Sequence, residues 1–455
     1  MGGKCDYNNS VEKFEQDSQS GPAPDRRINT MANCAIVGIN WGDEGKGRMV
    51  DLLAEDYDII VRYQGGNNAG HTIVNKYGKF ALNLLPSGIF RRSKMNVLGN
   101  GTVIDIRHLC GEMEKLRSAG IHISPSNLMI SNRAIIVMPY HVALDGLEEA
   151  RLSDKPYGST KRGIAPVYGD KYKKKGIMMG ELFDRKYLME HLRDVLEYEN
   201  LVITRVYGGE PFSFDSMMEY LDTYGEILKP YIGEVGYYLN NAAHEGKKIL
   251  YEAQLGALRD IDFGIYPYTS SSSPLAAYAP IGSGTPGIPV TRVVGVVKAY
   301  STCVGEGPFT VEWDGERAEK LREAGGEYGA ATGRPRRVGP IDLVATRYGV
   351  LMQGATEIAL TKLDVLSYLK EIPVCIAYDI DEGITKNFPF PSKLNGAQPV
   401  FKHMPGWCCD ISSIRKYDEL PAACRSYIEY IEREIGCRIS YVSVGPGRDE
   451  IIYRD

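Results

Sequence analysis

The chain has 455 residues, nine cysteines and a formal net charge of −5 at pH 7. This length is sufficient for one large domain or a few ordinary ones, and the small charge argues against a general nucleic-acid-binding or membrane surface. An odd cysteine count without paired Cys-x-x-Cys spacing disfavours a disulfide framework or a structural zinc site, so we expect reduced thiols and a cytoplasmic location. No apolar run reaches about eighteen residues, which predicts no membrane-spanning helix.

Residues 1–30 are polar and lack apolar periodicity, which predicts a mobile tail before a single catalytic domain over residues 31–455. Strand-like apolar runs then alternate with helical patterns. The alternation predicts an α/β fold with a large, mostly parallel central sheet flanked by helices, similar to P-loop NTPases and carrying insertions. We expect strands near residues 35–38, 59–63, 96–99, 134–138, 290–298, 358–360 and 373–378, and helices near 105–119, 217–243 and 419–434.

The first predicted strand runs into a glycine-rich loop that carries Asp43, Glu44 and Lys46 before a helical pattern resumes. Its glycines allow backbone N–H groups to approach an anion at the start of the helix, where Lys46 adds a positive charge. Gly47 stands where the usual P-loop has its Mg²⁺-binding hydroxyl, so Asp43 is the candidate to face the phosphates or their metal, or to act as a base. The alternative is a tight turn with a solvated Asp43-Glu44 pair.

A second polar, glycine-dense loop follows the strand expected at residues 59–63 and ends at His71. Loops at the carboxyl ends of parallel strands meet at one edge of a sheet, so Asp43 and His71 are expected to face a common ligand. The alternative for His71 is a structural histidine whose hydrogen bonds are satisfied within the protein.

Three later segments have compositions suited to anions or bases. Residues 158–175 mix hydroxyls, glycines and lysines, which suits a phosphate monoester, and residues 328–337 place three arginines on a Gly/Pro loop, which suits carboxylates or phosphates. Asp364 can accept two hydrogen bonds from the N1–H and 2-amino edge of guanine while the Lys362 stem covers the base, which favours GTP over ATP. Solvated basic loops and an ion pair at the end of a strand are the alternatives.

Six motifs occur in the order found in adenylosuccinate synthetases, and this chain resembles that family from about residue 33 to its end. The motifs are GDEGKG (residues 42–47), GGNNAGHT (65–72), DIDFGIYPY (260–268), KAYST (298–302), GRPRR (333–337) and TKLD (361–364). The resemblance implies GTP-dependent ligation of L-aspartate to IMP, giving adenylosuccinate, GDP and phosphate through 6-phosphoryl-IMP, the first committed step from IMP to AMP. A related synthetase for another purine monophosphate and a non-catalytic GTP-binding paralogue are the alternatives.

The resemblance also implies site residues. Asp43 would be the base, His71 an acid and Lys46 a neutralising charge, with one Mg²⁺ per subunit held by Asp43 and the Gly70 carbonyl. The implied GTP contacts are Gly42, Asp43, Glu44, Gly45, Lys46, Gly47, Arg48, Gly70, His71, Thr72, Arg336, Lys362, Leu363, Asp364, Ser443, Val444 and Gly445. The implied IMP contacts are Asp43, Lys46, Asn68, His71, Thr160, Lys174, Gln254, Leu255, Ser270 and Arg334. The implied aspartate contacts are Ala330, Ala331, Thr332, Gly333, Arg334 and Arg336.

This chain departs from the family pattern at several of these positions. Lys174 replaces an arginine that reaches the IMP phosphate from the partner subunit of a homodimer, and Ala331 replaces the first of two threonines. An ungapped match puts Leu255 where the family has an amide that reads the purine 6-oxygen, with Gln254 one residue early. Either the backbone shifts so that Gln254 supplies the amide, or the contact is lost. We favour the shift, because leucine offers no donor to a developing oxyanion.

Overall fold

The computed structural model describes residues 33–68, 70–75, 78–154, 156–329, 333 and 335–454. The predicted tail, residues 1–30, lies outside these ranges. Whether the remainder is a single domain stays a prediction. None of the helices in the described ranges combines the length and the apolar composition that a membrane crossing requires. The described cysteines are all free thiols, as the cysteine pattern predicted.

A ten-stranded sheet forms the centre of the molecule, in the order β20-β19-β15-β11-β1-β10-β2-β5-β7-β9. Every neighbouring pair is parallel except β19 and β20, so the predicted mostly parallel sheet is confirmed. The strands are β1 (Cys34–Gly38), β2 (Ile59–Arg62), β5 (Met95–Leu98), β7 (Leu128–Ser131), β9 (Ile232–Gly233), β10 (Ile249–Gly256), β11 (Arg292–Lys298), β15 (Glu357–Thr361), β19 (Ile439–Ser443) and β20 (Ile451–Tyr453). All five residues of β1 are buried, which explains its continuous apolar sequence.

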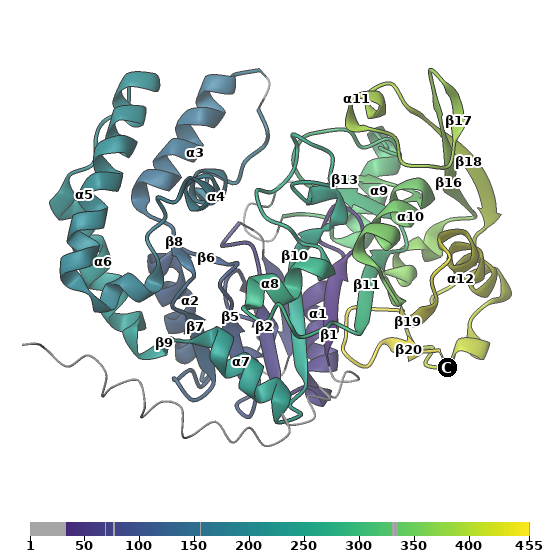
Figure 1. Cartoon of the computed structure of the whole chain (residues 1–455). Helices are drawn as coiled ribbons and strands as arrows, with labels where there is room; N and C mark the ends of the chain where they lie inside the picture. The colour runs from purple at the N-terminus through teal and green to yellow at the C-terminus, as the bar shows by residue number, and fades with distance from the viewer. Residues whose placement is uncertain are drawn as a thin grey trace, which may run out of the picture.

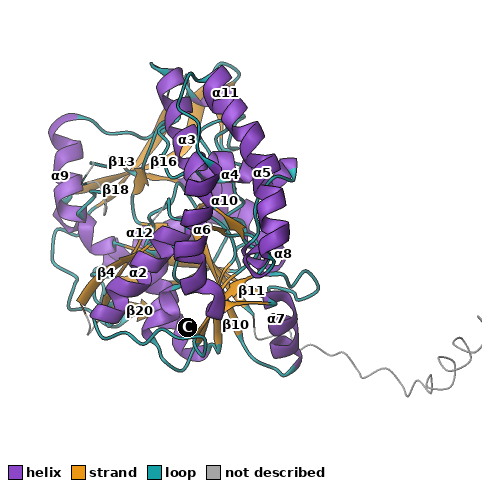
Figure 2. Ribbon diagram, turned by 90° about the vertical axis from the view of Figure 1, so that its left-hand side faces the viewer, coloured by secondary structure: helices purple, strands orange, loops and turns teal. Residues whose placement is uncertain are grey.

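Helices surround the sheet. In Figure 1, α2, α3, α5 and α6 lie toward the β9 end of the sheet and α9, α10 and α12 toward its β20 end, and Figure 2 shows the first group in front of the strands. The helices are α1 (Lys46–Leu53), α2 (Ile106–Ser118), α3 (Pro139–Leu152), α4 (Ile164–Lys173), α5 (Arg185–Leu201), α6 (Phe214–Leu228), α7 (Val235–His244), α8 (Ala279–Ser283), α9 (Gly315–Gly325), α10 (Leu343–Gln353), α11 (Pro391–Leu394) and α12 (Ala422–Ile435). The segment from α3 to α6 is a helical insertion between strands.

Short strands form smaller sheets beside the central one. The pairs are β3 (His71–Asn75) with β4 (Gly78–Leu82), β6 (Val103–Ile104) with β8 (Ile135–Ile136), and β12 (Ser301–Cys303) with β13 (Arg337–Gly339). A four-stranded sheet contains β14 (Ile341–Asp342), β16 (Glu371–Ile380), β17 (Gly383–Thr385) and β18 (Gln398–Pro405). The strand expected at residues 373–378 therefore exists, but it belongs to this separate sheet.

One predicted helix is wrong. Residues 217–243 do not form a continuous helix, because α6 ends at Leu228 and is followed by a 3-10 turn (Lys229–Tyr231) and then by β9. Pro230 lies in that turn, where it removes a backbone N–H that a continuing helix needs. The apolar periodicity resumes in α7, which is why the two helices look like one in the sequence.

Parallel pairing brings the carboxyl ends of the central strands to one edge of the sheet. The segments after β1, β2, β10, β11, β15 and β19 all start from that edge. These segments contain most of the predicted site residues. Helix α10 is connected to the end of β1, because the Nε2 atom of Gln353 donates a hydrogen bond to the Gly38 carbonyl at 3.0 Å.

We predict that Gly349→Ala destabilises the protein, although alanine normally favours a helix over glycine. A Cβ on Gly349, in α10, would lie 2.0 Å from the carbonyl oxygen of Ile39, and a backbone atom cannot easily move away. We expect the free energy of unfolding to fall by about 1–3 kcal/mol in a denaturant titration. Leu351→Ala, at a 71% exposed position of the same helix, should change it by less than about 0.5 kcal/mol. Equal stability of Gly349→Ala and wild type would contradict the close contact.

Candidate functional site

The loop between β1 and α1 has the backbone shape of an anion-binding turn. Gly42, Asp43 and Gly45 adopt φ angles of 108°, 60° and 97°, so positive φ recurs through the loop. Such a turn directs successive N–H groups into a concave surface, here at the N-terminus of α1, which begins at Lys46. The hydroxyl of Thr361, at the end of β15, donates to the Glu44 carbonyl at 2.7 Å and fastens the loop to the sheet.

Glu44 and Lys46 point into the protein. The Glu44 carboxylate accepts hydrogen bonds from the backbone N–H groups of Asn40 (3.2 Å) and Gly42 (2.8 Å), and Lys46 Nζ lies 2.6 Å from its other oxygen. The Glu44 and Lys46 side chains are each only 3% exposed. The alternative of a solvated Asp43-Glu44 pair is therefore wrong for Glu44. Its side chain stabilises the loop, and its contact with GTP stays a prediction.

His71 is the first residue of β3 rather than part of the preceding loop, and a buried carboxylate orients its ring. Its Nδ1 atom lies 2.5 Å from Oε1 of Glu252. The hydroxyl of Ser87 donates to the same oxygen, and the backbone N–H of Ser87 donates to Oε2 of Glu252. Burial lowers the pKa of His71, although the negative charge of Glu252 opposes this shift. Within the described part of the chain, the buried Nε2 atom of His71 has no hydrogen-bond partner. Nε2 is thus the atom that remains for a ligand.

Gln254 and Leu255 lie in an irregular part of β10. Ile36 pairs with Glu252 but Gly38 pairs with Gly256, so two residues of β1 span four residues of β10. Gln254 is fully buried: Arg62 Nη2 donates to its Oε1 at 3.0 Å, and its Nε2 donates to Oδ1 of Asn68 at 3.2 Å. Leu255 instead has a φ of 65° and approaches the loop at Gly42. The strand is thus irregular at this point, and which of Gln254 and Leu255 faces the purine stays a prediction.

The predicted guanine-reading residues lie at the ends of β15 and β19. Asp364 is partly buried, and among the described residues its buried Oδ1 atom has no hydrogen-bond partner. Burial raises the pKa of Asp364 above its usual value. Arg48, in α1, donates to the hydroxyl of Ser443 and to the carbonyl of Gly445, both at 2.6 Å. Arg48 thus connects α1, which directly follows the loop after β1, to the segment that begins at Ser443.

Leu363 and Val444 are fully buried, so they contribute packing beside these polar groups. Lys362 has a φ of 59°, and its Nζ atom donates to the Gly325 carbonyl at 2.6 Å and to Glu327 at 2.8 Å. In the structure, the Lys362 ammonium group therefore points to the segment after α9.

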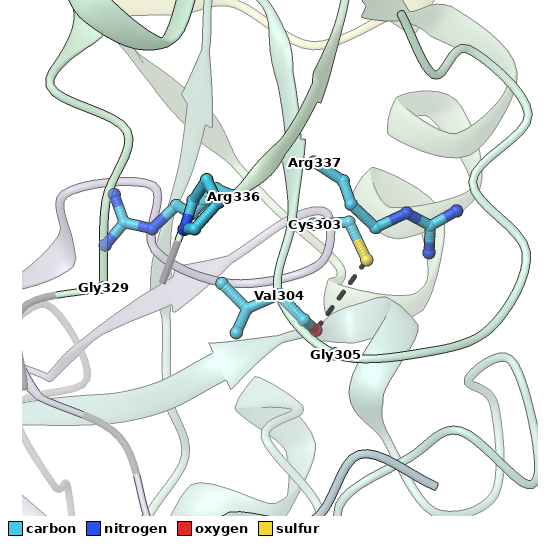
Figure 3. Close-up of a pocket in the computed structure, with 7 residues that line it drawn as sticks. Cys303, Val304, Gly305, Gly329, Arg336 and Arg337 are labelled. Atoms are coloured by element: carbon cyan, nitrogen blue, oxygen red, sulfur yellow. Dashed lines mark hydrogen bonds between the residues drawn. The ribbon is translucent and has the colours of Figure 1, made fainter. Parts of the chain in front are cut away.

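Arg336 and Arg337, at the end of the predicted aspartate loop, contact different partners. Arg336 Nε lies 3.1 Å from Oδ2 of Asp43, whereas Arg337 donates to Glu312 and to the Gly307 carbonyl. Figure 3 shows the two guanidinium groups pointing away from each other, around a cavity of about 60 Å³ lined by Cys303, Val304, Gly305, Gly329, Pro335, Arg336 and Arg337. The predicted grip by three arginines is therefore wrong for Arg337. Ala330, Ala331, Thr332 and Arg334 lie outside the described residues, whereas Gly333 is described and exposed.

The remaining predicted IMP contacts lie in two segments, one around Ser270 and one around α4. Ser270 shares a hydrogen bond with Ser272, whose hydroxyl donates to Gln64, and Gln64 donates to the Gln254 carbonyl. Thr160 is exposed in the segment that leads into α4, and Ile164, the first residue of α4, packs against Gly66. Lys174, the residue after α4, is exposed and has a φ of 65°. The side chain of Thr72 is not described.

Comparisons with known proteins agree on one family. The family model described as adenylosuccinate synthetase matches residues 35–452. The chain is 44% identical over 426 residues to the adenylosuccinate synthetase of Halothermothrix orenii, with 93% of this chain and 99% of that protein covered. It is 45% identical to the enzyme of Caldicellulosiruptor bescii, with 92% and 99% covered. The chain belongs to the adenylosuccinate synthetase family.

Solved structures support the fold. The fully ligated adenylosuccinate synthetase of Plasmodium falciparum has a TM-score of 0.87 and 35% identity, with 93% of this chain and 99% of that one covered. A cyanophage S-2L succinoaminodeoxyadenylate synthetase, bound to dGMP and dATP, has a TM-score of 0.58 and 18% identity, with 93% and 95% covered, and shows the shared fold alone. The α/β architecture predicted for an adenylosuccinate synthetase is confirmed, as is the family's ligation of aspartate to IMP as the activity class.

Sequence reasoning missed three charged residues that support the synthetase site: Arg62, Glu252 and Glu327. Arg62 and Glu252 lie in the buried strands β2 and β10. A single charged residue in an otherwise apolar, buried strand was the available signal, because such a group needs a partner. Glu327 directly precedes the arginine-containing loop and had no comparable signal.

We predict that Gln254→Ala lowers turnover about ten- to a thousandfold, the range for losing one oxyanion donor. Gln398→Ala, at an exposed position of β18, is the matched control and should leave turnover unchanged. Steady-state kinetics with IMP as the varied substrate measures the effect. Near-normal turnover of Gln254→Ala, with a change in nucleotide preference for Leu255→Gln, would instead place position 255 beside the purine.

Proposed function

We propose that this member of the family ligates L-aspartate to IMP with GTP as co-substrate, through 6-phosphoryl-IMP. The observation that carries the proposal is the 3.1 Å ion pair between Asp43 and Arg336. It brings the proposed base next to an arginine proposed to bind aspartate and GTP. The direct test follows adenylosuccinate absorbance with IMP, GMP or dGMP, each against GTP and ATP. Only the IMP and GTP combination should turn over efficiently.

In the proposed reaction, Asp43 removes the N1 proton of IMP. The resulting 6-oxyanion attacks the γ-phosphorus of GTP and GDP leaves. The neutral aspartate amine then displaces phosphate from C6 and loses a proton. The 6-oxygen is a poor leaving group by itself. Its phosphorylation in the first step allows it to leave as phosphate in the second. The non-catalytic alternative has less support, because Asp43, Lys46 and His71 are all retained, in or directly after the loops that follow β1 and β2.

His71 and Lys46 would supply positive charge to the phosphates. The Glu252 carboxylate accepts a hydrogen bond from Nδ1–H of His71, so a neutral ring presents Nε2 as an acceptor. A phosphate oxygen near Nε2 favours the imidazolium form, which donates from both nitrogens. Glu252 stabilises the imidazolium form of His71. The Nε2–H group can therefore donate to the phosphate oxygens on which negative charge develops during the reaction.

The available ligands fit Mg²⁺. The carboxylate of Asp43 and the carbonyl of Gly70 are the hard oxygen donors that this ion prefers. The described residues contain no group of three or more His, Cys, Asp or Glu side chains that could hold a metal. Phosphate and water oxygens must therefore complete the coordination. When bound, Mg²⁺ would neutralise phosphate charge.

A homodimer with a shared site is also part of the proposal. Lys174 is exposed at the end of α4 and extends the lysine run from residue 171. An exposed cation in this position is available to the IMP phosphate of a second copy. Light scattering on the purified protein tests the dimer, and a fully active monomer at all concentrations would exclude it. A cytoplasmic location stays a prediction.

We predict that Asp43→Ala lowers turnover by at least about a hundredfold, since it removes both a general base and a metal ligand. Asp43→Asn keeps the size of the side chain but not its charge, and should be similarly inactive. Folding should survive in both, because the Asp43 side chain is 31% exposed and lies outside the core. Circular dichroism checks folding and the absorbance assay checks turnover. More than a few per cent of residual activity would remove Asp43 from the base role.

We predict that Asp364→Asn raises the KM for GTP about ten- to a hundredfold and reduces the preference for GTP over ITP, which lacks the 2-amino group. The amide replaces one acceptor oxygen by an NH₂ donor. That donor cannot accept a hydrogen bond from the N1–H or 2-amino group of guanine. Asp381→Asn, at an exposed position between β16 and β17, is the control. An unchanged KM for GTP in Asp364→Asn would exclude this residue from guanine recognition.

A further inference from the structure

Glu327 is a buried carboxylate between α9 and β13 with four side-chain partners. Its side chain has no exposed surface. Lys298 Nζ lies 2.9 and 3.0 Å from its two oxygens, and the Tyr300 hydroxyl donates to Oε1 at 2.5 Å. Lys362 Nζ donates to Oε1 at 2.8 Å, and Arg336 Nη1 donates to Oε2 at 2.6 Å.

The three cationic partners come from three separate segments of the chain. Lys298 ends β11, Lys362 follows β15, and Arg336 precedes β13. The main chain adds a further connection, because the Arg336 N–H donates to the Glu327 carbonyl at 2.9 Å. Glu327 is therefore the point at which the predicted guanine segment and the predicted aspartate loop meet.

The local charge balance explains why a carboxylate is needed here. Lys298, Lys362 and Arg336 are three cations that all pair with the Glu327 carboxylate, and Arg336 also pairs with Asp43. Lys362 in addition interacts electrostatically with Asp364. Burial lowers the pKa of Lys298 to about 8. Burial alone would raise the pKa of Glu327, but the three cations lower it far below its usual value. Without the carboxylate, these cations would repel one another in a poorly solvated region.

We propose that Glu327 is a positioning residue that couples the guanine-reading segment to the aspartate loop, by holding Lys362 and Arg336 with the two oxygens of one carboxylate. The inference rests on the proposed function. Glu327 itself contacts no substrate in this account, because its oxygens are occupied by these donors. Displacement of either cation shifts the carboxylate and hence the other cation. Occupancy of the guanine site should then change the affinity for aspartate.

The first test compares Glu327→Gln with wild type by steady-state kinetics on the full chain. The amide keeps the shape of the side chain but leaves the cations without a counter-charge. We expect the KM values for GTP and aspartate to rise about ten- to a hundredfold, with the KM for IMP within about threefold. Glu327→Asp, which restores the charge, should recover part of this loss. Tyr300→Phe removes one hydrogen bond from the same carboxylate without changing any charge, and should leave all three KM values within about threefold.

The second test measures the coupling itself. Lys362→Ala removes a residue of the guanine segment, so a change in the KM for aspartate must be transmitted through the protein. We expect that KM to rise at least about threefold in the wild-type background and not in the Glu327→Gln background. An unchanged aspartate KM in Lys362→Ala, or an equal effect in both backgrounds, would overturn the coupling.

Other outcomes separate the inference from its alternatives. Lower stability or a lower kcat of Glu327→Gln with unchanged KM values would indicate a purely structural carboxylate and overturn the proposal. If Glu327→Gln does not fold, the aspartate KM of Lys362→Ala alone decides, because an unchanged value still overturns the coupling. An active wild-type enzyme with no coupling rejects the inference alone. A wild-type protein that does not form adenylosuccinate rejects the proposed function and the inference with it.

Discussion

The carboxylate of Glu44 fixes the geometry on which the rest of the site depends. It accepts hydrogen bonds from two backbone N–H groups of the loop after β1 and from Lys46. The loop therefore folds around one buried carboxylate. The neighbouring strands accommodate it only because they lack side chains at this point. A Cβ on Gly38 would lie 2.6 Å from one Glu44 oxygen, and a Cβ on Gly256 would lie 2.7 Å from the other. The anion-binding turn therefore requires glycine on β1 and on β10 as well as in the loop.

Buried carboxylates behind cationic groups recur across the site. Glu44 pairs with the Lys46 ammonium group and Glu327 with the Arg336 guanidinium group, and Glu252 orients the His71 ring, which becomes cationic when a phosphate is bound. All three carboxylates are 3% exposed or less. The ligands of the family are anionic, so cations must be held in place before they bind. Cations without counter-charges would repel one another and would lose solvation without compensation. The carboxylates let the site keep preorganised positive charge in a buried setting.

Short sequence patterns were sufficient to predict many elements of the fold. Glycine spacing predicted the turn between β1 and α1. Apolar runs predicted the central strands β1, β2, β5, β11 and β15, and helical patterns predicted α2 and α12. The supporting contacts could not be found in the same way, because His71 and Glu252 are 181 residues apart and Arg62 and Gln254 are 192 apart. The orientation of Arg337 also depends on Glu312, on a distant segment. Side-chain partners of this kind are set by the tertiary fold.

The orientation of the Gln254 amide follows from its neighbour. Arg62 has only hydrogen-bond donors, so the atom that faces it must be the amide oxygen. The NH₂ group therefore faces Asn68, on the side of the second loop, where IMP is proposed to bind. A donor in this position suits the 6-oxygen of hypoxanthine and opposes the 6-amino group of adenine. Guanine carries the same 6-oxygen, so the proposed contact of Gln254 cannot separate IMP from GMP. Discrimination between them must come from groups near C2 of the purine.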